Sequence, residues 1–375
     1  MNFLDIIRAV SIIQFFIAGF FFLSHKKGNL TANKLLAVFL ISKAICYLGD
    51  YTFINFEYFL NNAPFLFSFS GGLDLLLGPP LYLYSKSLAY KDFKLKKCHF
   101  LHIIPFILYM IYYAVIFLFF IKQNYRAYIL DDFALSGSAI IINSLVYFHF
   151  IIYSILCLLV LRKYNKKLKA EFSSLEKKKL NWLSFLVFGF ILIWFSGYYN
   201  YLAFILKLQF EIPWIILILL VFLFANAIIF MSLKQPELFS GIIQQEAVPK
   251  YAKTALPEER KDEFLEKILT YMKNEKPYLN PNLTITEVSE CISIPAYYLS
   301  QVINSSLNQN FYDFVNSYRI EESKNYFQNN SKNTILEVLY EVGFNSKSSF
   351  NKAFKKYTGM TPSEFKRNQG ISFAE

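Results

Sequence analysis

Near the C-terminal end of the chain, lysine and asparagine side chains recur on one face of a predicted helix. This helix lies in "VGFNSKSSFNKAFKKYTGMTPSEF" (342–365), after a turn that contains Gly343. Helical spacing turns Phe350, Ala353 and Phe354 inward. The side chains on the opposite face are Lys347, Asn351, Lys352, Lys355 and Lys356. Lysine can bind phosphate and asparagine can pair with adenine, so this face has the chemistry needed to contact a nucleic acid.

The net charge of the whole chain, +11, does not by itself indicate a nucleic-acid partner. Residues 1–249 contain 22 Lys and Arg against 12 Asp and Glu, whereas residues 250–375 contain 16 against 15. Within this nearly neutral second part, residues 347–367 contain six basic residues and one acidic residue. The positive charge of the second part is therefore concentrated on and beside the lysine-rich helix.

Two helix-turn-helix patterns position this face and a counterpart upstream. In the first pattern Thr284 is the predicted N-cap, Glu287 completes a capping box, and residues 292–294 separate two short helices. In the second pattern Gly343 occupies the turn, where a positive φ angle is needed. A longer helix over "FYDFVNSYRIEESKNYF" joins them, and an amphipathic helix between Pro257 and Pro277 precedes them. Periodicity alone leaves open whether these helical hairpins bind DNA.

Residues 262–370 closely resemble the C-terminal DNA-binding domain of the AraC/XylS family of bacterial transcription regulators. The resemblance is strongest in the Gly-Phe turn and Phe–Phe spacing of the stretch quoted above, and at Gly359, Thr361 and Pro362. It implies two helix-turn-helix units joined by a long helix, each offering a recognition helix to successive major-groove segments on one DNA face. The stretches "LLGPPLYLYSKSL", "HFLHIIPF" and "LKQPELF" resemble a less familiar arrangement, in which a seven-span region is fused directly to this domain.

Carried over by position, the resemblance implies recognition helices at about 295–304 and 346–356. The residues expected on the solvent side of the first are Ala296, Tyr297, Ser300, Gln301 and Asn304. The residues expected nearest the bases in the second are Ser346, Lys347, Ser348, Asn351 and Lys352. Gln301 and Asn351 have side chains that can pair with adenine. The lysines expected to hold phosphate are Lys352 and Lys355.

The first unit departs from the family pattern more than the second does. Ser293 stands where the family's first turn often has Gly, and Pro295 stands where it often has a Ser cap. Leu339 and Ser323 each replace a usual small residue. We expect these changes to leave the fold intact, but they prevent a transfer of base preferences to the first unit.

The first two thirds of the chain have the composition of a membrane-spanning bundle. Over the whole chain 55% of the residues are hydrophobic and 19% are aromatic. Because about 20 apolar residues cross the hydrocarbon core of a bilayer, we predict seven spans, at about 3–23, 35–55, 65–85, 100–121, 137–161, 181–206 and 213–233. The predicted fold class is all-α, with a seven-helix transmembrane bundle (1–234), a linker (235–257) and an AraC-type domain with two helix-turn-helix units (258–375).

The charges of the loops orient these predicted spans. The loops after spans 1, 3 and 5 contain 16 Lys and Arg residues, whereas the opposite loops contain Lys122, Arg126 and Lys207. By the positive-inside rule the N-terminus lies outside and residues 234–375 lie in the cytoplasm, in a multi-pass protein of the cytoplasmic membrane. The basic loop 162–179 either only fixes this topology or also binds anionic lipid or a partner.

Lys43, Asp50 and Asp74 fall inside the predicted spans. Lys43 and Asp74 lie at depths that allow them to pair, counted at about 1.5 Å per residue. The pair is either an interhelical clamp or part of a ligand or ion site. Gly78-Pro79-Pro80 predicts a kink in the third span. His99 and His102 have i, i+3 spacing but no third ligand, so we expect them to anchor a span at the interface.

Together these features favour a membrane-anchored one-component transcription regulator over an enzyme. The expected partners are double-stranded DNA, the lipid bilayer and an unknown small-molecule or membrane signal, with coupling through a homodimer as a hypothesis. The alternative is a transporter or channel-like protein with a cytoplasmic regulatory domain, although the spans have no internal repeat. All four histidines precede residue 150 and the tail lacks a Gly-rich phosphate loop, which disfavours a kinase or a metal site there. We expect no cofactor and no metal.

Overall fold

The computed structural model describes residues 3–26, 28–54, 71–90, 92–120, 137–175, 180–208, 211–234, 258–329 and 333–368. Across these residues the fold is all-α, as predicted, and β-type pairing is limited to an isolated antiparallel bridge between Phe172 and Thr284. The chain divides into two compact units. The first contains Met1–Arg162 and Leu180–Gln245, and the second contains Lys163–Lys179 and Glu246–Glu375.

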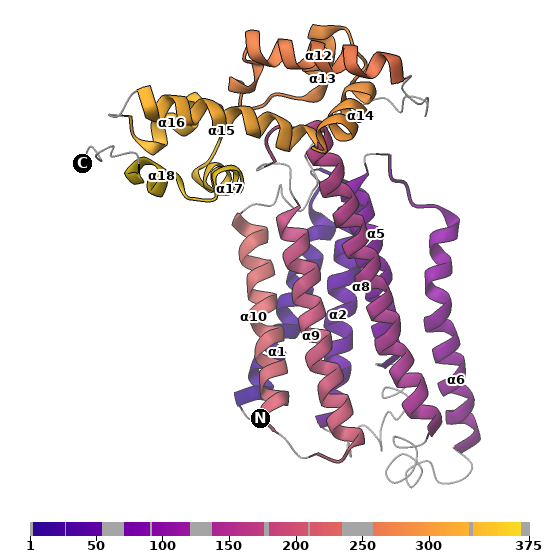
Figure 1. Cartoon of the computed structure of the whole chain (residues 1–375). Helices are drawn as coiled ribbons and strands as arrows, with labels where there is room; N and C mark the ends of the chain where they lie inside the picture. The colour runs from indigo at the N-terminus through magenta and orange to yellow at the C-terminus, as the bar shows by residue number, and fades with distance from the viewer. Residues whose placement is uncertain are drawn as a thin grey trace. The chain divides into compact units, whose positions relative to one another are not determined.

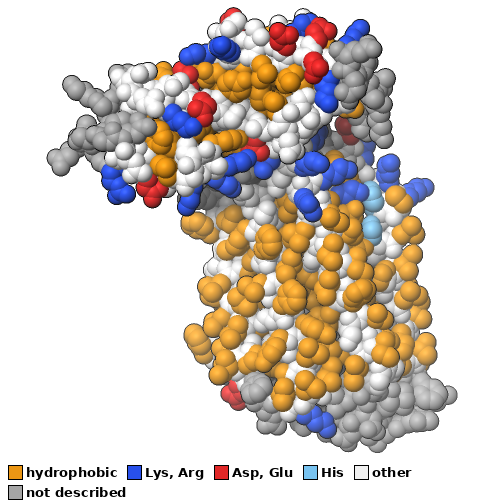
Figure 2. Space-filling view, viewed as in Figure 1, with side chains coloured by type: hydrophobic (Ala, Val, Ile, Leu, Met, Phe, Trp, Pro, Cys, Tyr) orange, Lys and Arg blue, Asp and Glu red, His pale blue; other side chains and the backbone are white. Residues whose placement is uncertain are grey.

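Apolar helices build the first unit (Figure 1). They are α1 (Phe3–Ser24), α2 (Leu30–Ile54), α5 (Gly78–Ala89), α6 (Ile104–Phe120), α8 (Gly137–Glu171), α9 (Asn181–Ile205) and α10 (Ile212–Lys234), with the short 3-10 helices η1 (Asp74–Leu76) and η2 (Lys97–Ile103) before α5 and α6. Six helical segments of the described chain are long and apolar enough to cross a membrane, by length and composition. On the face seen in Figure 2, hydrophobic side chains cover the length of this bundle and Lys and Arg side chains gather at one end.

The predicted third span (65–85) starts in residues that lie outside the described ones. In its described part, η1 is followed by α5, which begins at Gly78 with a proline in its first turn. Proline suits that position because the first N–H groups of a helix have no intrahelical acceptor. Gly78-Pro79-Pro80 therefore starts a new helix where the sequence predicted a kink in a continuous one.

Close packing at small residues and hydrogen bonds between helices help to hold the first unit together. A Cβ added at Gly19 of α1 would lie 2.6 Å from Ile41 Cγ1 of α2, and one added at Gly189 of α9 would collide with the Phe224 ring of α10. Gln14 Nε2 of α1 donates to Asn226 Oδ1 of α10 at 3.1 Å. Helices that associate in lipid usually pack closely at small residues and form hydrogen bonds between polar side chains.

Helices α12 to α18 form the bulk of the second unit (Figure 1). They are α12 (Glu258–Asn274), η5 (Pro277–Leu279), α13 (Ile285–Ile292), α14 (Ala296–Leu307), α15 (Phe311–Asn329), α16 (Ile335–Glu341), α17 (Lys347–Thr358) and α18 (Pro362–Asn368). The capping box predicted at Thr284 is present, because its Oγ1 accepts from the Glu287 N–H at 3.2 Å and the Glu287 carboxylate accepts from the Thr284 N–H at 3.0 Å.

Two hydrophobic cores divide these helices into two lobes that share α15. In the first lobe α12, α13 and α14 pack around Ile268, Leu299 and Phe314. In the second lobe α16, α17 and α18 pack around a core that includes Phe350 and Phe354. Phe314 lies in the first half of α15, and Ile320 and Phe327 of the same helix belong to the second core. The long connecting helix predicted from the sequence is thus one element with a face in each core.

The segment after the fifth predicted span differs from the expected loop. Helix α8 continues to Glu171, well past the predicted end of that span at 161, so residues 162–171 are helical. The part of α8 from Lys163 onward belongs to the second unit, together with the residues that follow it. The predicted linker (235–257) lies outside the described residues, and the domain boundaries remain a prediction.

Candidate nucleic-acid interface

Each of the two helix-turn-helix turns contains a residue with a positive φ angle, and that residue differs between the turns. Ser293, which ends α13, has a φ angle of +54° and a ψ angle of +37°, in the left-handed region. Gly343, in the turn before α17, has a φ angle of +88°, which confirms the positive φ predicted there. A Cβ at Gly343 would lie 2.6 Å from the Tyr278 carbonyl oxygen and 2.7 Å from that of Leu279. Glycine is therefore required at the second turn by conformation and by space.

Helix α17 presents the predicted polar face. Ser346 is its N-cap and accepts a hydrogen bond from the Ser349 N–H at 3.3 Å, so this hydroxyl closes the helix end. Phe350 and Phe354 are fully buried, as predicted. The predicted contact residues that are exposed along α17 are Lys347, Ser348, Lys352 and Lys355, and Asn351 is half-buried. A helix held by two buried rings can offer these side chains as a rigid set.

Two other lysines of the basic stretch 347–367 form contacts within the domain. Lys356 Nζ lies 2.7 Å from Asp313 Oδ1 of α15, although the sequence placed Lys356 on the outward basic face. Lys366 is 2% exposed and donates to the Asn333 carbonyl oxygen at 2.6 Å. Both contacts are between residues far apart in the chain, which local periodicity does not encode. The basic face of the second lobe is therefore smaller than the sequence count suggested.

Helix α14, the counterpart in the first lobe, has no charged side chain between Ala296 and Leu307. The prediction that Ala296 faces solvent is wrong, since it is 7% exposed within the first core. Ala296 shares one helical stripe with Leu299 and Ile303, at spacings of three and seven residues, and both of these are fully buried. Of the remaining predicted contacts, Tyr297 is 38% exposed.

The polar side chains of α14 are partly occupied by local hydrogen bonds. Asn304 Nδ2 donates to the Ser300 carbonyl oxygen at 2.6 Å, and it lies 3.5 Å from Ser300 Oγ. Gln301 Oε1 is buried without a hydrogen-bond partner among the described residues. A buried acceptor without a donor is costly, so a ligand that supplies an N–H to Gln301 would recover that cost.

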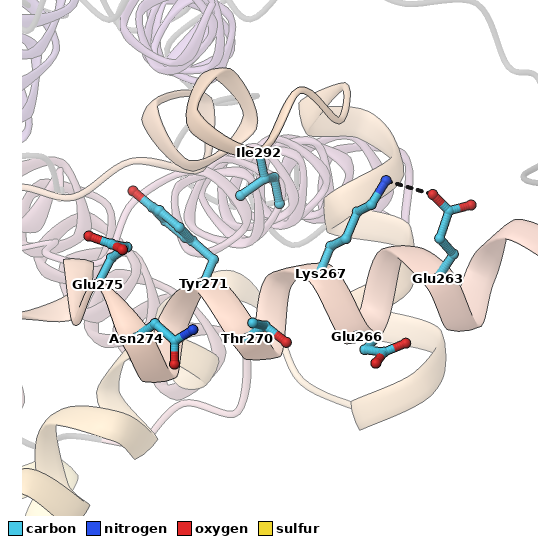
Figure 3. A pocket seen from close by; sticks show the side chains of 8 residues that line it. All are labelled: Glu263, Glu266, Lys267, Thr270, Tyr271, Asn274, Glu275 and Ile292. Atoms are coloured by element: carbon cyan, nitrogen blue, oxygen red, sulfur yellow. Dashed lines mark hydrogen bonds and ion pairs between the residues drawn. The ribbon is translucent and has the colours of Figure 1, made fainter.

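A shallow pocket of about 460 Å³ opens beside α12 (Figure 3). Its walls are side chains of Glu263, Glu266, Lys267, Thr270, Tyr271, Asn274 and Glu275 from α12, together with Ile292 at the end of α13. Lys267 is paired with Glu263 at 2.6 Å, as the dashed line in Figure 3 marks. Three glutamates and one paired lysine make an unsuitable surface for phosphate, and none of the predicted DNA contacts lines it.

The sequence pattern gave no sign of a buried arginine at the centre of the second unit. Arg319 of α15 is 1% exposed, and its guanidinium stands over the Phe344 ring, 5.5 Å from the centroid. Burial lowers the pKa of Arg319 to about 10, which leaves it charged at neutral pH. Its Nε donates to the Tyr278 carbonyl oxygen at 2.7 Å, and a terminal nitrogen donates to that of Asn280 at 2.8 Å. Arg319 therefore joins α15 to the segment between η5 and α13.

In the first unit, the structure brings two of the predicted intramembrane charges near each other. Asp74 lies within electrostatic range of Lys43. Lys43 is 8% exposed, with its Nζ 5.8 Å from the Tyr47 ring centroid. A direct Lys43–Asp74 pair remains a prediction. Among the described residues, no group of three metal-ligating side chains includes His99 or His102.

The first unit also contains an apolar cavity of about 680 Å³ between α8 and α9. Its lining includes Tyr147, Phe150 and Ser154 of α8 and Trp194 and Tyr198 of α9. The Trp194 ring stacks on Phe150 with centroids 4.3 Å apart. A cavity with these walls suits a lipophilic molecule.

The geometry of the second unit agrees with its resemblance to known sequences. A family model described as a helix-turn-helix domain matches residues 288–368. The chain is similar to an uncharacterized transcriptional regulatory protein, YesN, of Bacillus subtilis, at 31% identity over 93 residues. It is also similar to the Msm operon regulatory protein of Streptococcus mutans, at 29% identity over 86 residues. A third relative, an uncharacterized HTH-type transcriptional regulator in the cgkA 5' region of Pseudoalteromonas carrageenovora, is 32% identical over 93 residues.

These matches concern one part of the chain. They cover 24%, 23% and 25% of it, and 25%, 31% and 54% of the respective relatives. A solved structure described as the C-terminal domain of AraT, a response regulator from Geobacillus stearothermophilus, matches 29% of this chain and 87% of that one at 25% identity. Its TM-score of 0.26 carries no structural argument. The sequence matches assign an AraC-type helix-turn-helix domain to the C-terminal part of the chain.

Proposed function

We propose that this protein is a membrane-anchored one-component transcription regulator, whose C-terminal domain binds promoter DNA in response to a signal received by the membrane region. The observation that carries the proposal is the combination, on one chain, of membrane-length apolar helices and two helix-turn-helix lobes joined by α15. One chain that holds both parts needs no separate messenger between signal and promoter.

In this proposal the two lobes divide the work of binding DNA. The exposed Lys352 and Lys355 of α17 hold phosphate, while Asn351 and Gln301 contact base edges. The recognition helices α14 and α17 then enter successive major-groove segments on one face of the duplex. The lysine-rich segments support an orientation with the N-terminus outside the cell and the DNA-binding domain in the cytoplasm, by the positive-inside rule.

The signal enters this proposal as a ligand of the membrane region. The apolar cavity between α8 and α9 supports a lipophilic molecule as its chemical class. A homodimer would raise the local concentration of one DNA-binding domain near another and so couple the signal to a promoter with two sites. Crosslinking that found one fixed oligomeric state, with target genes both on and off, would rule out this dimer step.

The test of the proposal is capture of fragmented genomic DNA by the full chain in lipid nanodiscs, at about 0.15 M salt. The wild type is expected to recover a few discrete sites, and both Asn351→Ala and Lys352→Ala are expected to recover them more weakly. Recovery that is spread over all sequences, or that is unchanged in both variants, would contradict sequence-specific binding by α17. A wild type that recovers no DNA at all would contradict the proposal as a whole.

A further inference from the structure

Four residues that follow α8 bind across the AraC-type domain, at the junction of its two lobes. We call these residues, Phe172–Leu175, the strap. The strap lies in the stretch that joins α8 to α9, and the domain residues that it contacts lie more than a hundred positions further along the chain. It nonetheless belongs to the same compact unit as the domain.

The surface under the strap is formed by three parts of the domain, which together we call the seam. These parts are the segment Tyr278–Thr284 before α13, the buried Arg319 of α15, and the turn Gly343–Asn345 before α17. They already touch one another without the strap. Arg319 binds the carbonyl oxygens of Tyr278 and Asn280, and Asn345 Nδ2 donates to the Pro281 carbonyl oxygen at 3.3 Å. The seam thus contains residues of both lobes.

The strap first pairs with the seam through its backbone. Phe172 forms an antiparallel bridge with Thr284, the N-cap of α13. The Ser173 N–H donates to the Leu283 carbonyl oxygen at 3.1 Å, and the Ser173 hydroxyl donates to the same oxygen at 2.7 Å. Ser173 is 1% exposed and Leu175 is 4% exposed, so the strap is embedded.

Side chains of α15 and of the second turn complete the contact. Arg319 donates from one terminal nitrogen to the Ser173 carbonyl oxygen and from the other to Ser173 Oγ, both at 3.2 Å. Asn345 Nδ2 lies 3.2 Å from Ser174 Oγ. Asn345 directly precedes Ser346, the N-cap of α17. The strap therefore contacts the first lobe at Leu283, the shared helix at Arg319 and the second lobe at Asn345.

We propose that the seam is a docking site for the strap, and that the loop after α8 thereby fixes how the two helix-turn-helix lobes are arranged. Two recognition helices can bind successive grooves only at one separation, which the docked strap holds constant. The regulatory meaning of this docking rests on the proposed function, because it matters only if both lobes contact DNA.

The contacts also make the docking reversible. Three of the five hydrogen bonds of Arg319 go to groups of the domain itself, namely the carbonyl oxygens of Tyr278 and Asn280 and the Asn316 side chain at 3.2 Å. Without the strap, the nitrogens that face Ser173 would be open to water, and the domain would keep its own cores. Of the described helices, α8 alone has residues in both units, and it leads directly into the strap. A displacement of α8 is thus the simplest way to release it.

The experiment uses the full chain in nanodiscs, with a protease site introduced within residues 235–257 and Cys98→Ser and Cys291→Ser to remove the two exposed thiols. Ser174→Cys and Asn345→Cys are then combined and oxidised, the linker is cut, and the fragments are separated in denaturant without a reductant, so that only a disulfide can hold them together. If the strap docks, the C-terminal fragment stays attached to the membrane fragment until a reductant is added. The control pair is Ser174→Cys with Ser363→Cys, an exposed residue of α18 outside the seam, and it should release the fragment.

Ser173→Pro in the same crosslinking background tests the hydrogen bonds between the strap and the Leu283 carbonyl oxygen. It removes the N–H and the hydroxyl that bind Leu283, and proline is compatible with a position just past a helix end. The rate of crosslinking should fall about tenfold, the effect of leaving one buried carbonyl without its donor. An equal rate in the Ser173→Pro variant, or crosslinking in the control pair as fast as in the test pair, would overturn the docking.

The outcome is separable from that of the proposed function. A chain that captures discrete DNA sites but does not crosslink through Ser174 and Asn345 would refute the strap and leave the regulator intact. A chain that crosslinks specifically but captures no DNA would refute the regulator and leave the docking site in place.

Discussion

The two helix-turn-helix lobes of the second unit share a scaffold and differ in the chemistry of their recognition helices. Helix α14 in the first lobe has no charged side chain, whereas α17 in the second has four lysines. One of these, Lys356, is bound to Asp313, which leaves Lys347, Lys352 and Lys355 exposed. Under the proposed function, the second lobe supplies the electrostatic attraction to DNA and the first adds discrimination through neutral contacts.

The turns of the two lobes also differ in how well their residues suit a positive φ angle. The second turn has Gly343 packed against two carbonyl oxygens, and the first has Ser293 in a left-handed conformation that a side chain only tolerates. The second lobe therefore meets the demands of its motif with the residue best suited to them. The first lobe meets them with a strained substitute, Ser293, which is one of the positions where it departs from the sequence pattern that it resembles.

The largest effect is expected from Gly343→Ser, which gives the second turn the residue of the first. The new Cβ would collide with the Tyr278 and Leu279 carbonyl oxygens, and the positive φ angle adds strain. The folding stability of the second lobe should therefore fall by about 3 kcal/mol or more. Hydrogen exchange in the full chain would show loss of protection in α17. Protection equal to that of the wild type would contradict the close approach at this turn.

The next effect is expected from removing phosphate contacts of the second lobe. The double variant Lys352→Ala and Lys355→Ala should weaken DNA binding and reduce the slope of log K against log salt by about 1.8. Lys356→Ala is the matched control, because its ammonium is already paired with Asp313. Fluorescence anisotropy on a captured site at several salt concentrations measures both slopes. If the control reduces the slope as much as the double variant does, the ion pair with Asp313 does not keep Lys356 from contributing to DNA binding.

A smaller effect, confined to sequence preference, is expected from the neutral side chains. Gln301→Ala in the first lobe and Asn351→Ala in the second should each reduce discrimination at one base pair by about 1–3 kcal/mol. The salt slope should not change in either variant. Selection from a randomised site would show the relaxed positions, and these should lie in different half-sites. A relaxed position shared by both variants would show that only one lobe reads bases.

The smallest effect is expected from Ser293→Gly, the reverse exchange. Glycine adopts the left-handed conformation without the clash that a Cβ causes, so the first lobe should gain about 1 kcal/mol in stability. Hydrogen exchange of α14 in the full chain can detect this gain. A loss of protection would mean that the hydroxyl of Ser293 has a structural role that outweighs the strain.

Much of the scaffold follows from local sequence. Apolar length predicted the long apolar helices of the first unit, and 3.6-residue periodicity placed Phe350 and Phe354 in the core, where both are fully buried. The capping box at Thr284 and the positive φ of Gly343 also followed, because each depends on a few neighbouring residues. The face of α17 was predictable for the same reason.

Other features were decided by contacts between distant parts of the chain. Ala296 was predicted on the wrong side because its stripe with Leu299 and Ile303 is packed by other helices of the first core. Lys366 was counted among the basic residues of 347–367, but it is buried and donates a hydrogen bond to the Asn333 carbonyl oxygen. Side-chain type and spacing define a helix face, but they do not say which partner covers it.

By itself, the sequence determined the two-part character of this protein, with apolar helices of membrane length followed by a double helix-turn-helix domain. Only the tertiary structure showed that Arg319 is buried and that Phe172–Leu175 binds the seam beside it. The physical reason is that periodicity, capping and turn chemistry act over a few residues. The contact between Ser173 and Arg319 joins groups 146 positions apart, and it depends on how folded elements pack.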